Sequence, residues 1–219
     1  MGRTGKALLF TIMAVGTVSA QTSDKRVKTN LFVWEPPTID WPDSPSPATI
    51  QMEMIVALKV ADFPIILEKT ELEAAQRRFG GTIGSRGDAG DAEGWLCLYG
   101  RSAKGRWMLW LTSTEMNGPS IGGFQWRRLS PNESPDRRCS TIPKGSGIKL
   151  PIALHLGMSE QEVRRILGRP TFVRGKVLIY CHDHSQLIDG ATYDASNNVA
   201  LVLRNGAVWV IKASKTTSN

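Results

Sequence analysis

The chain of 219 residues predicts an α+β fold made of two tandem units, each with one helix packed on an antiparallel sheet. Alternating apolar residues, typical of half-buried strands, open each unit, a short capped helix follows, and three strand-like runs close it. Matching residues recur 89, 88 and 84 positions apart in the two halves, namely Thr70 and Ser159, Gly80 and Gly168, and Cys97 and Cys181. We therefore infer a tandem duplication.

The first unit is expected over residues 50–138. Alternation from Ile50 to Ala61 predicts its first strand, which the break at Asp62-Phe63-Pro64 ends. Thr70 and Glu73 have the spacing of a capping box at a helix start, and Gly80-Gly81 favours the helix end. Three further strands are expected at residues 95–99, 107–112 and 124–129.

The second unit is expected over residues 139–213, followed by a tail at 214–219. Alternation from Ile148 to Leu154 predicts a strand, and Ser159 with Glu162 forms another capping box. Gly168 and Pro170 then end the helix. Strands follow at residues 176–181, 199–203 and 207–211, and the last two are joined by Asn205-Gly206, a strong hairpin signal.

The first twenty residues have the features of an export signal. Basic Arg3 and Lys6 precede an apolar run that ends in Val18-Ser19-Ala20, which predicts cleavage after Ala20 and a periplasmic or secreted bacterial protein. Position 21 is glutamine instead of the cysteine that bacterial lipoproteins carry, so we expect no lipid anchor. Residues 21–49 are rich in proline and predict an extended arm, whose Trp34 and Trp41 we expect to dock on the domain.

Composition excludes two classes of protein. A hydrophobic content of 41% and a mean hydropathy of −0.18 exclude a polytopic membrane protein, and no transmembrane segment is expected. The net charge of +7 falls to +5 without Arg3 and Lys6 and is spread along the chain, so we expect no nucleic acid as a partner.

Export makes disulfide chemistry available to the three cysteines. One internal bridge can form, between residues 97 and 139, 97 and 181, or 139 and 181. We favour Cys97 with Cys139 because both lie in the same half of the molecule. Three buried thiols remain the alternative.

Residues 156–171 resemble a known family. Leu156-Gly157-Met158-Ser159 and Ile166-Leu167-Gly168-Arg169-Pro170 are similar to the G-M-S/T-x-x-x-V-x-x-x-L-G-x-P signature of the SmpA/OmlA (BamE-like) domain and the β-lactamase-inhibitor-protein-like repeat. Residues 201–208 resemble their closing hairpin. The resemblance implies a helix-on-sheet module of the bacterial envelope that binds proteins, and its matching fold residues are Gly157, Ser159, Glu162, Gly168 and Pro170.

Aromatic residues indicate a binding surface. Both faces of the strand around Trp107 and Trp110 are apolar, and one short helix covers only one face of a sheet. Tryptophan beside arginine is common at protein interfaces. We therefore expect Trp110, Trp126, Arg127 and Trp209 to form an aromatic surface on the helix-free face, with packing inside the molecule as the alternative.

Histidines supply a rival interpretation. His182 and His184 share one face of a strand, and His155 is a possible third metal ligand for a metal-dependent or otherwise unrecognised hydrolase. The sequence contains no G-x-S-x-G nucleophile motif. The leading interpretation is an exported, non-enzymatic module without a cofactor, which binds a protein or a component of the cell envelope. A purely structural envelope protein is a third possibility.

Overall fold

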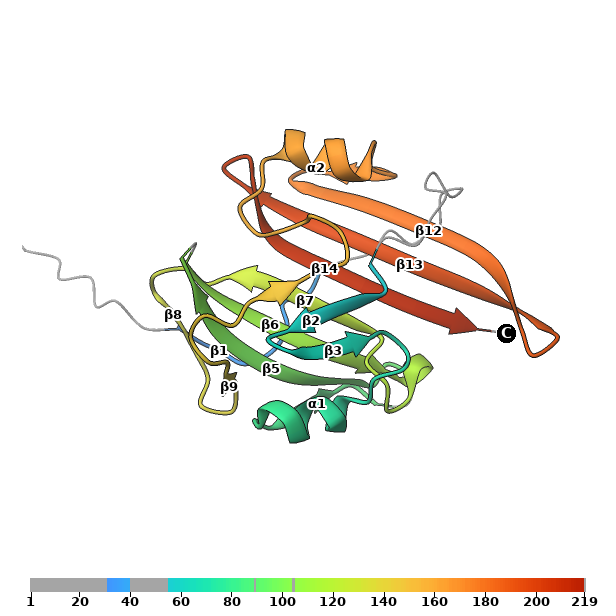
Figure 1. Ribbon diagram of the computed structural model, residues 1–219, viewed down its shortest axis with the longest axis horizontal. Helices are drawn as coiled ribbons and strands as arrows, with labels where there is room; N and C mark the ends of the chain where they lie inside the picture. Colours follow the sequence, from blue (N-terminus) through green and yellow to red (C-terminus); the bar gives the residue numbers. More distant parts are fainter. Residues whose placement is uncertain (1–30, 40–54, 89, 104, 219) are drawn as a thin grey trace, which may run out of the picture.

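The chain folds around one large antiparallel sheet (Figure 1). The computed structural model describes residues 31–39, 55–88, 90–103 and 105–218, so the expected signal peptide, Trp41 and residues 50–54 of the expected first strand lie outside it. The sheet has the strand order β11-β12-β13-β14-β7-β6-β5-β4, and β9 adds to β5 in parallel. Its strands are β4 (Ile83–Arg86), β5 (Glu93–Ser102), β6 (Gly105–Thr114), β7 (Gly123–Arg128), β9 (Ser140–Thr141), β11 (Phe172–Arg174), β12 (Val177–Ile188), β13 (Ala191–Arg204) and β14 (Ala207–Ser218).

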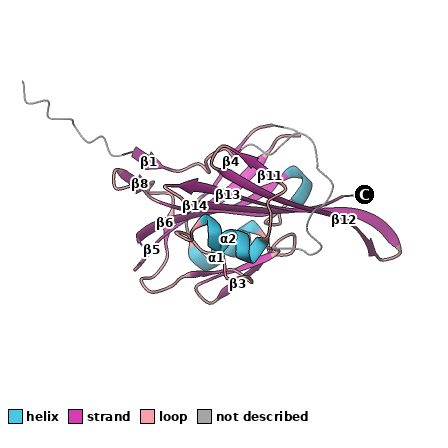
Figure 2. Cartoon of the chain, turned by 90° about the horizontal axis from the view of Figure 1, so that it is seen from above, coloured by secondary structure: helices cyan, strands magenta, loops and turns pink. Residues whose placement is uncertain are grey.

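The expected fold class, an α+β protein of two tandem helix-on-sheet units, is wrong. Strands make up 53% of the structure and helices 11%, and the helices are short beside the long strands (Figure 2). The two halves of the chain share one sheet because β14 pairs with β7, which places Ile211 opposite Trp126. Pairing these strands removes two exposed sheet edges, which would otherwise carry unpaired backbone groups.

One face of the large sheet carries the main core. Helices α1 (Leu72–Phe79) and α2 (Glu160–Leu167) pack there, together with a small sheet of β10 (Ile148–Lys149), β2 (Ala57–Val60) and β3 (Phe63–Ile66). Buried Ala75, Val163 and Val60 from these elements belong to the same cluster as Leu109 and Leu201 of the sheet. A single continuous core therefore replaces the two small ones that separate units would have.

The N-terminal arm crosses the opposite face. Strand β1 (Leu31–Val33) pairs in parallel with β8 (Glu133–Pro135). The carbonyl of Trp34 then accepts a hydrogen bond of 2.8 Å from Trp110 Nε1, and its ring lies edge-on to Trp95 with centroids 5.8 Å apart. Further along, Ile39 packs on the cluster of Ile179, Cys181 and Ala200. The docking predicted for Trp34 is confirmed.

Identical capping signals have different outcomes in the two helices. At α2 the capping box is confirmed, because Ser159 Oγ accepts from the Glu162 amide (3.3 Å) and the Glu162 carboxylate accepts from the Ser159 amide (2.8 Å). At α1 it is wrong, because the helix begins one residue later with Glu71 as its N-cap. The Thr70 hydroxyl instead accepts from the Ile66 amide (2.9 Å) and closes the loop after β3.

Two turns suggested by the sequence connect neighbouring antiparallel strands. Asn205 and Gly206 both have positive φ (53° and 73°), as the predicted two-residue hairpin requires. The expected break at residues 62–64 is instead a hairpin between β2 and β3, in which Ala61 adopts φ 54° and Pro64 lies on an edge strand, where its missing N–H costs no ladder bond.

Several connections cross position 138, where we had divided the chain. Strands β9 and β10 pair with β5 and β2 across this boundary. A disulfide joins Cys97 to Cys139, the pairing favoured from the sequence, but it links the two expected units instead of lying within one. The residues expected as a tail continue β14 to Ser218, and the Glu68 carboxylate accepts from the Thr217 amide (2.6 Å). The remaining cysteine, Cys181, is a buried free thiol whose pKa is raised by burial.

Removing the disulfide is expected to destabilise the protein by about 3–4 kcal/mol, because the bridge restricts a loop of 42 residues in the unfolded chain. The Cys97→Ala/Cys139→Ala variant should therefore unfold at a lower urea concentration than the wild type. A reducing agent should lower the wild-type midpoint toward that of the variant without moving the variant. Equal midpoints for variant and oxidised wild type would contradict the expectation.

Buried Asn197 is expected to be the most costly polar side chain to truncate. It accepts from the Ile55 amide (3.2 Å) and donates to the carbonyls of Ile55 (3.1 Å) and Ser214 (2.9 Å). Asn197→Ala leaves these buried groups without those bonds, and we expect a loss of about 3 kcal/mol in urea unfolding. The neighbouring Asn198→Ala, which removes one bond to the Ser196 hydroxyl, should cost about 0.5 kcal/mol.

Candidate functional site

The structure separates the residues expected to form an aromatic surface. Trp110 is fully buried on the face covered by the arm, whereas Trp126 is 8% exposed and belongs to the core on the helix face. Arg127 is occupied internally, because its guanidinium lies 5.5 Å from the Trp110 ring and 3.0 Å from the Glu133 carboxylate. These three residues therefore form no common surface, and the alternative of packing inside the molecule describes them.

Trp209 is the one tryptophan of the expected set that is partly accessible. The pairing of β13 with β14 shifts between Val202 and Leu203, which leaves Trp209 opposite no residue in a β-bulge. Its half-buried ring lies 4.7 Å from the guanidinium of Arg204. One such ring is too little for the surface that we expected.

The histidines do not assemble the expected metal site in the described part of the chain. His182 and His184 lie close together on β12, with ring centroids 4.7 Å apart, as their alternation predicts. His155 precedes α2, where its Nδ1 lies 3.1 Å from the Leu156 carbonyl oxygen. Among the described residues no three His, Cys, Asp or Glu side chains are placed to share a metal ion.

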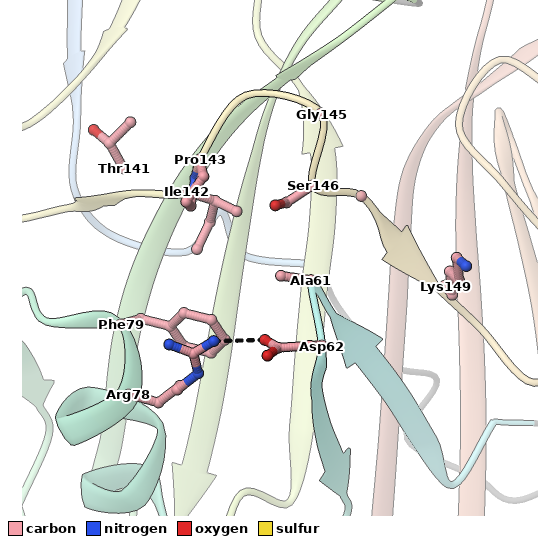
Figure 3. A pocket seen from close by; sticks show the side chains of 11 residues that line it. Ala61, Asp62, Arg78, Phe79, Thr141, Ile142, Pro143, Gly145, Ser146 and Lys149 are labelled. Carbon is pink, nitrogen blue, oxygen red and sulfur yellow. Dashed lines mark hydrogen bonds and ion pairs between the residues drawn. The ribbon is translucent and has the colours of Figure 1, made fainter.

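A groove that the sequence did not reveal lies at one end of the small sheet (Figure 3). It encloses about 650 Å³ and is open to solvent. The β2–β3 turn, the last turn of α1 and the segment 141–149 form its walls. Its lining residues are Ala61, Asp62, Arg78, Phe79, Thr141, Ile142, Pro143, Gly145, Ser146, Gly147 and Lys149.

A solvent-exposed ion pair forms part of the groove lining. Arg78 and Asp62 point toward each other with a separation of 2.6 Å (Figure 3), and the hydrogen bond from Arg78 lowers the pKa of the Asp62 carboxyl. Asp62 therefore stays ionised and is unsuited to donate a proton at neutral pH. This chemistry suits the binding of a ligand better than general acid catalysis.

Apolar and aromatic groups line the groove beside the ion pair. Phe79 packs edge-on against Phe63 with centroids 5.6 Å apart, and the Arg78 guanidinium lies 5.8 Å from the Phe79 ring. Ile142 and Pro143 face this end of α1 from the opposite wall (Figure 3). The groove thus places a cation and an anion directly beside apolar surface.

Hydrogen bonds hold the outer wall in place. The Ile142 amide donates to the Tyr99 carbonyl (2.7 Å) and the Ala61 amide to the Gly147 carbonyl (3.0 Å). The Ser140 hydroxyl donates to the carbonyl of Phe79, which ties the wall to the end of α1. The disulfide at Cys139 lies one residue before this contact and further restrains the start of the wall.

Sequence reasoning missed this site for a definite reason. Asp62 lies in an expected chain break, and residues 143–147 belong to the expected second unit, before its expected first strand. The ion pair joins residues 16 positions apart, and it forms only because a hairpin and a helix end meet. The one available signal was the pair of basic residues in the last turn of the predicted helix, Arg77 and Arg78.

Comparisons with known proteins identify no family. The chain matches no protein-family model, no curated protein and no solved structure. The likeness of residues 156–171 to the SmpA/OmlA domain therefore stays a prediction. Over the ranges that the structure describes, neither helix has the length and apolar character needed to cross a membrane.

Trp110→Ala is expected to act on stability, because the residue belongs to the core instead of a surface. Truncating a fully buried tryptophan should cost about 4 kcal/mol in urea unfolding. The half-buried Trp209 is the matched control, and Trp209→Ala should cost less than about 2 kcal/mol. A Trp110→Ala variant as stable as the wild type would show that this side chain is not part of the core.

Proposed function

We propose that this protein is an exported, non-enzymatic binding module of the cell envelope, and that a protein partner occupies the groove beside α1. The observation that carries the proposal is the groove itself, an open space of about 650 Å³ with charged and apolar walls. Its size and openness suit a segment of polypeptide better than an enclosed small molecule.

Two further observations support the proposal. The Cys97–Cys139 bridge is compatible with an exported protein, since such bonds persist in oxidising compartments. The family resemblance of residues 156–171 implies envelope proteins that act by binding other proteins. The groove places its carboxylate in an ion pair, which favours recognition over proton transfer.

Site-specific photocross-linking tests the proposal. A benzophenone amino acid at position 146, in the groove wall, should cross-link a polypeptide in the envelope of intact cells. The same group at position 173, which is 57% exposed on β11, is the matched control and should give no such product. No product from position 146, or equal yields from both positions, would overturn the proposal, provided that both variants melt like the wild type.

A further inference from the structure

We propose that the groove recognises an acidic segment of its partner, an inference that rests on the proposed function and adds the chemical class of the ligand. The evidence is a group of three cations in and beside the groove, combined with apolar surface in its lining.

Two lysines lie directly opposite each other on the solvent side of this sheet. Lys149 of β10 pairs in register with Lys59 of β2, and both side chains are exposed. Neither lysine has an ion pair with any residue that the structure describes. Directly opposite positions in an antiparallel pair bring Cβ atoms to about 5 Å, where like charges repel and reduce stability. The pair gives the fold no stability, but it offers two ammonium groups to an anion.

Arg78 adds a third cation and shows what the groove accepts. Its guanidinium already holds the carboxylate of Asp62 at 2.6 Å, and Lys59 also favours the ionised form of that carboxyl. Arg78 and Lys149 line the groove, and Lys59 lies just outside the lining, opposite Lys149. These three cations face the single lining carboxylate, Asp62, so positive charge is in excess. A ligand that supplies further carboxylates would balance it.

The apolar part of the groove lining favours an acidic polypeptide over a simple polyanion as the ligand. Phe79 and Pro143 present carbon surface in the groove, with Phe79 beside Arg78, and a phosphate polymer has no groups to cover it. In an extended peptide, side chains on one face repeat about every 7 Å and alternate with those on the other. Acidic side chains can therefore reach the lysines while an apolar or aromatic residue two positions along, on the same face of the peptide, packs on Phe79.

Binding of a labelled random copolymer of glutamate and tyrosine, followed by fluorescence anisotropy, tests the inference. The wild type should bind it with an affinity that falls as salt rises. Lys59→Glu/Lys149→Glu should weaken binding about tenfold or more, which corresponds to about 1.4 kcal/mol. The control Lys69→Glu/Lys176→Glu makes the same change in net charge at two exposed lysines that belong neither to the groove lining nor to the β2–β10 pair, and its affinity should change less than about twofold.

A neutral variant separates binding from folding. Lys59→Gln/Lys149→Gln removes the repulsion between the lysines, so it should melt no lower than the wild type and yet bind the copolymer more weakly. Equal losses of affinity in the groove variants and the control variant would show that the copolymer does not bind at the groove. If the wild type binds inorganic polyphosphate more tightly than the copolymer, the assignment of a polypeptide ligand is wrong and the ligand is a phosphate compound.

The two proposals can fail separately. If the copolymer does not bind while position 146 still cross-links a polypeptide, the acidic class is wrong and the binding function stands. If cross-linking from position 146 also fails, the function itself is wrong.

Discussion

The pairing of β14 with β7 is the interaction on which the rest of the structure depends. It joins the last strand of the chain to one from the middle of the chain, with Val210 opposite Arg127 and Ser214 opposite Gly123. Because of it the helix face is continuous, and α1, α2 and the small sheet share one core. Asn197 holds the segment just before β2 in place by hydrogen bonds with both the amide and the carbonyl of Ile55.

Other segments of the chain cover both faces of the large sheet, which leaves the rim of the molecule for binding. The helices and the small sheet cover one face, and the arm covers Trp110 on the other. The aromatic residues that looked like an interface are therefore used for stability. The groove arises at the rim, where the β2–β3 hairpin, the end of α1 and the segment after Cys139 meet. A module built this way keeps its core intact while it binds at its edge.

The two capping signals show how far local patterns determine structure. Ser159 and Thr70 have the same spacing to a glutamate, but Thr70 follows β3 so closely that its hydroxyl bonds the Ile66 amide instead. Likewise, alternation predicted that Trp107 and Trp110 lie on opposite faces, which the two buried clusters confirm. It did not predict which segment covers each face, because that depends on partners far away in the chain.

By itself, the sequence determined parts of six strands of the large sheet (β5, β6, β7, β12, β13 and β14), the Asn205-Gly206 hairpin and the capped second helix, and it favoured the Cys97–Cys139 bridge. It did not predict β4, β9 or β11, or that β12 and β13 extend through residues 182–188 and 191–198. The predicted features follow from backbone preferences and side-chain periods over a few residues, the bridge excepted. Only the tertiary structure decided that the halves share one sheet, that the arm buries Trp110, and that Asp62 meets Arg78. Those outcomes depend on contacts between strand edges and sheet faces that are far apart in the sequence, and no local sequence pattern predicts such contacts.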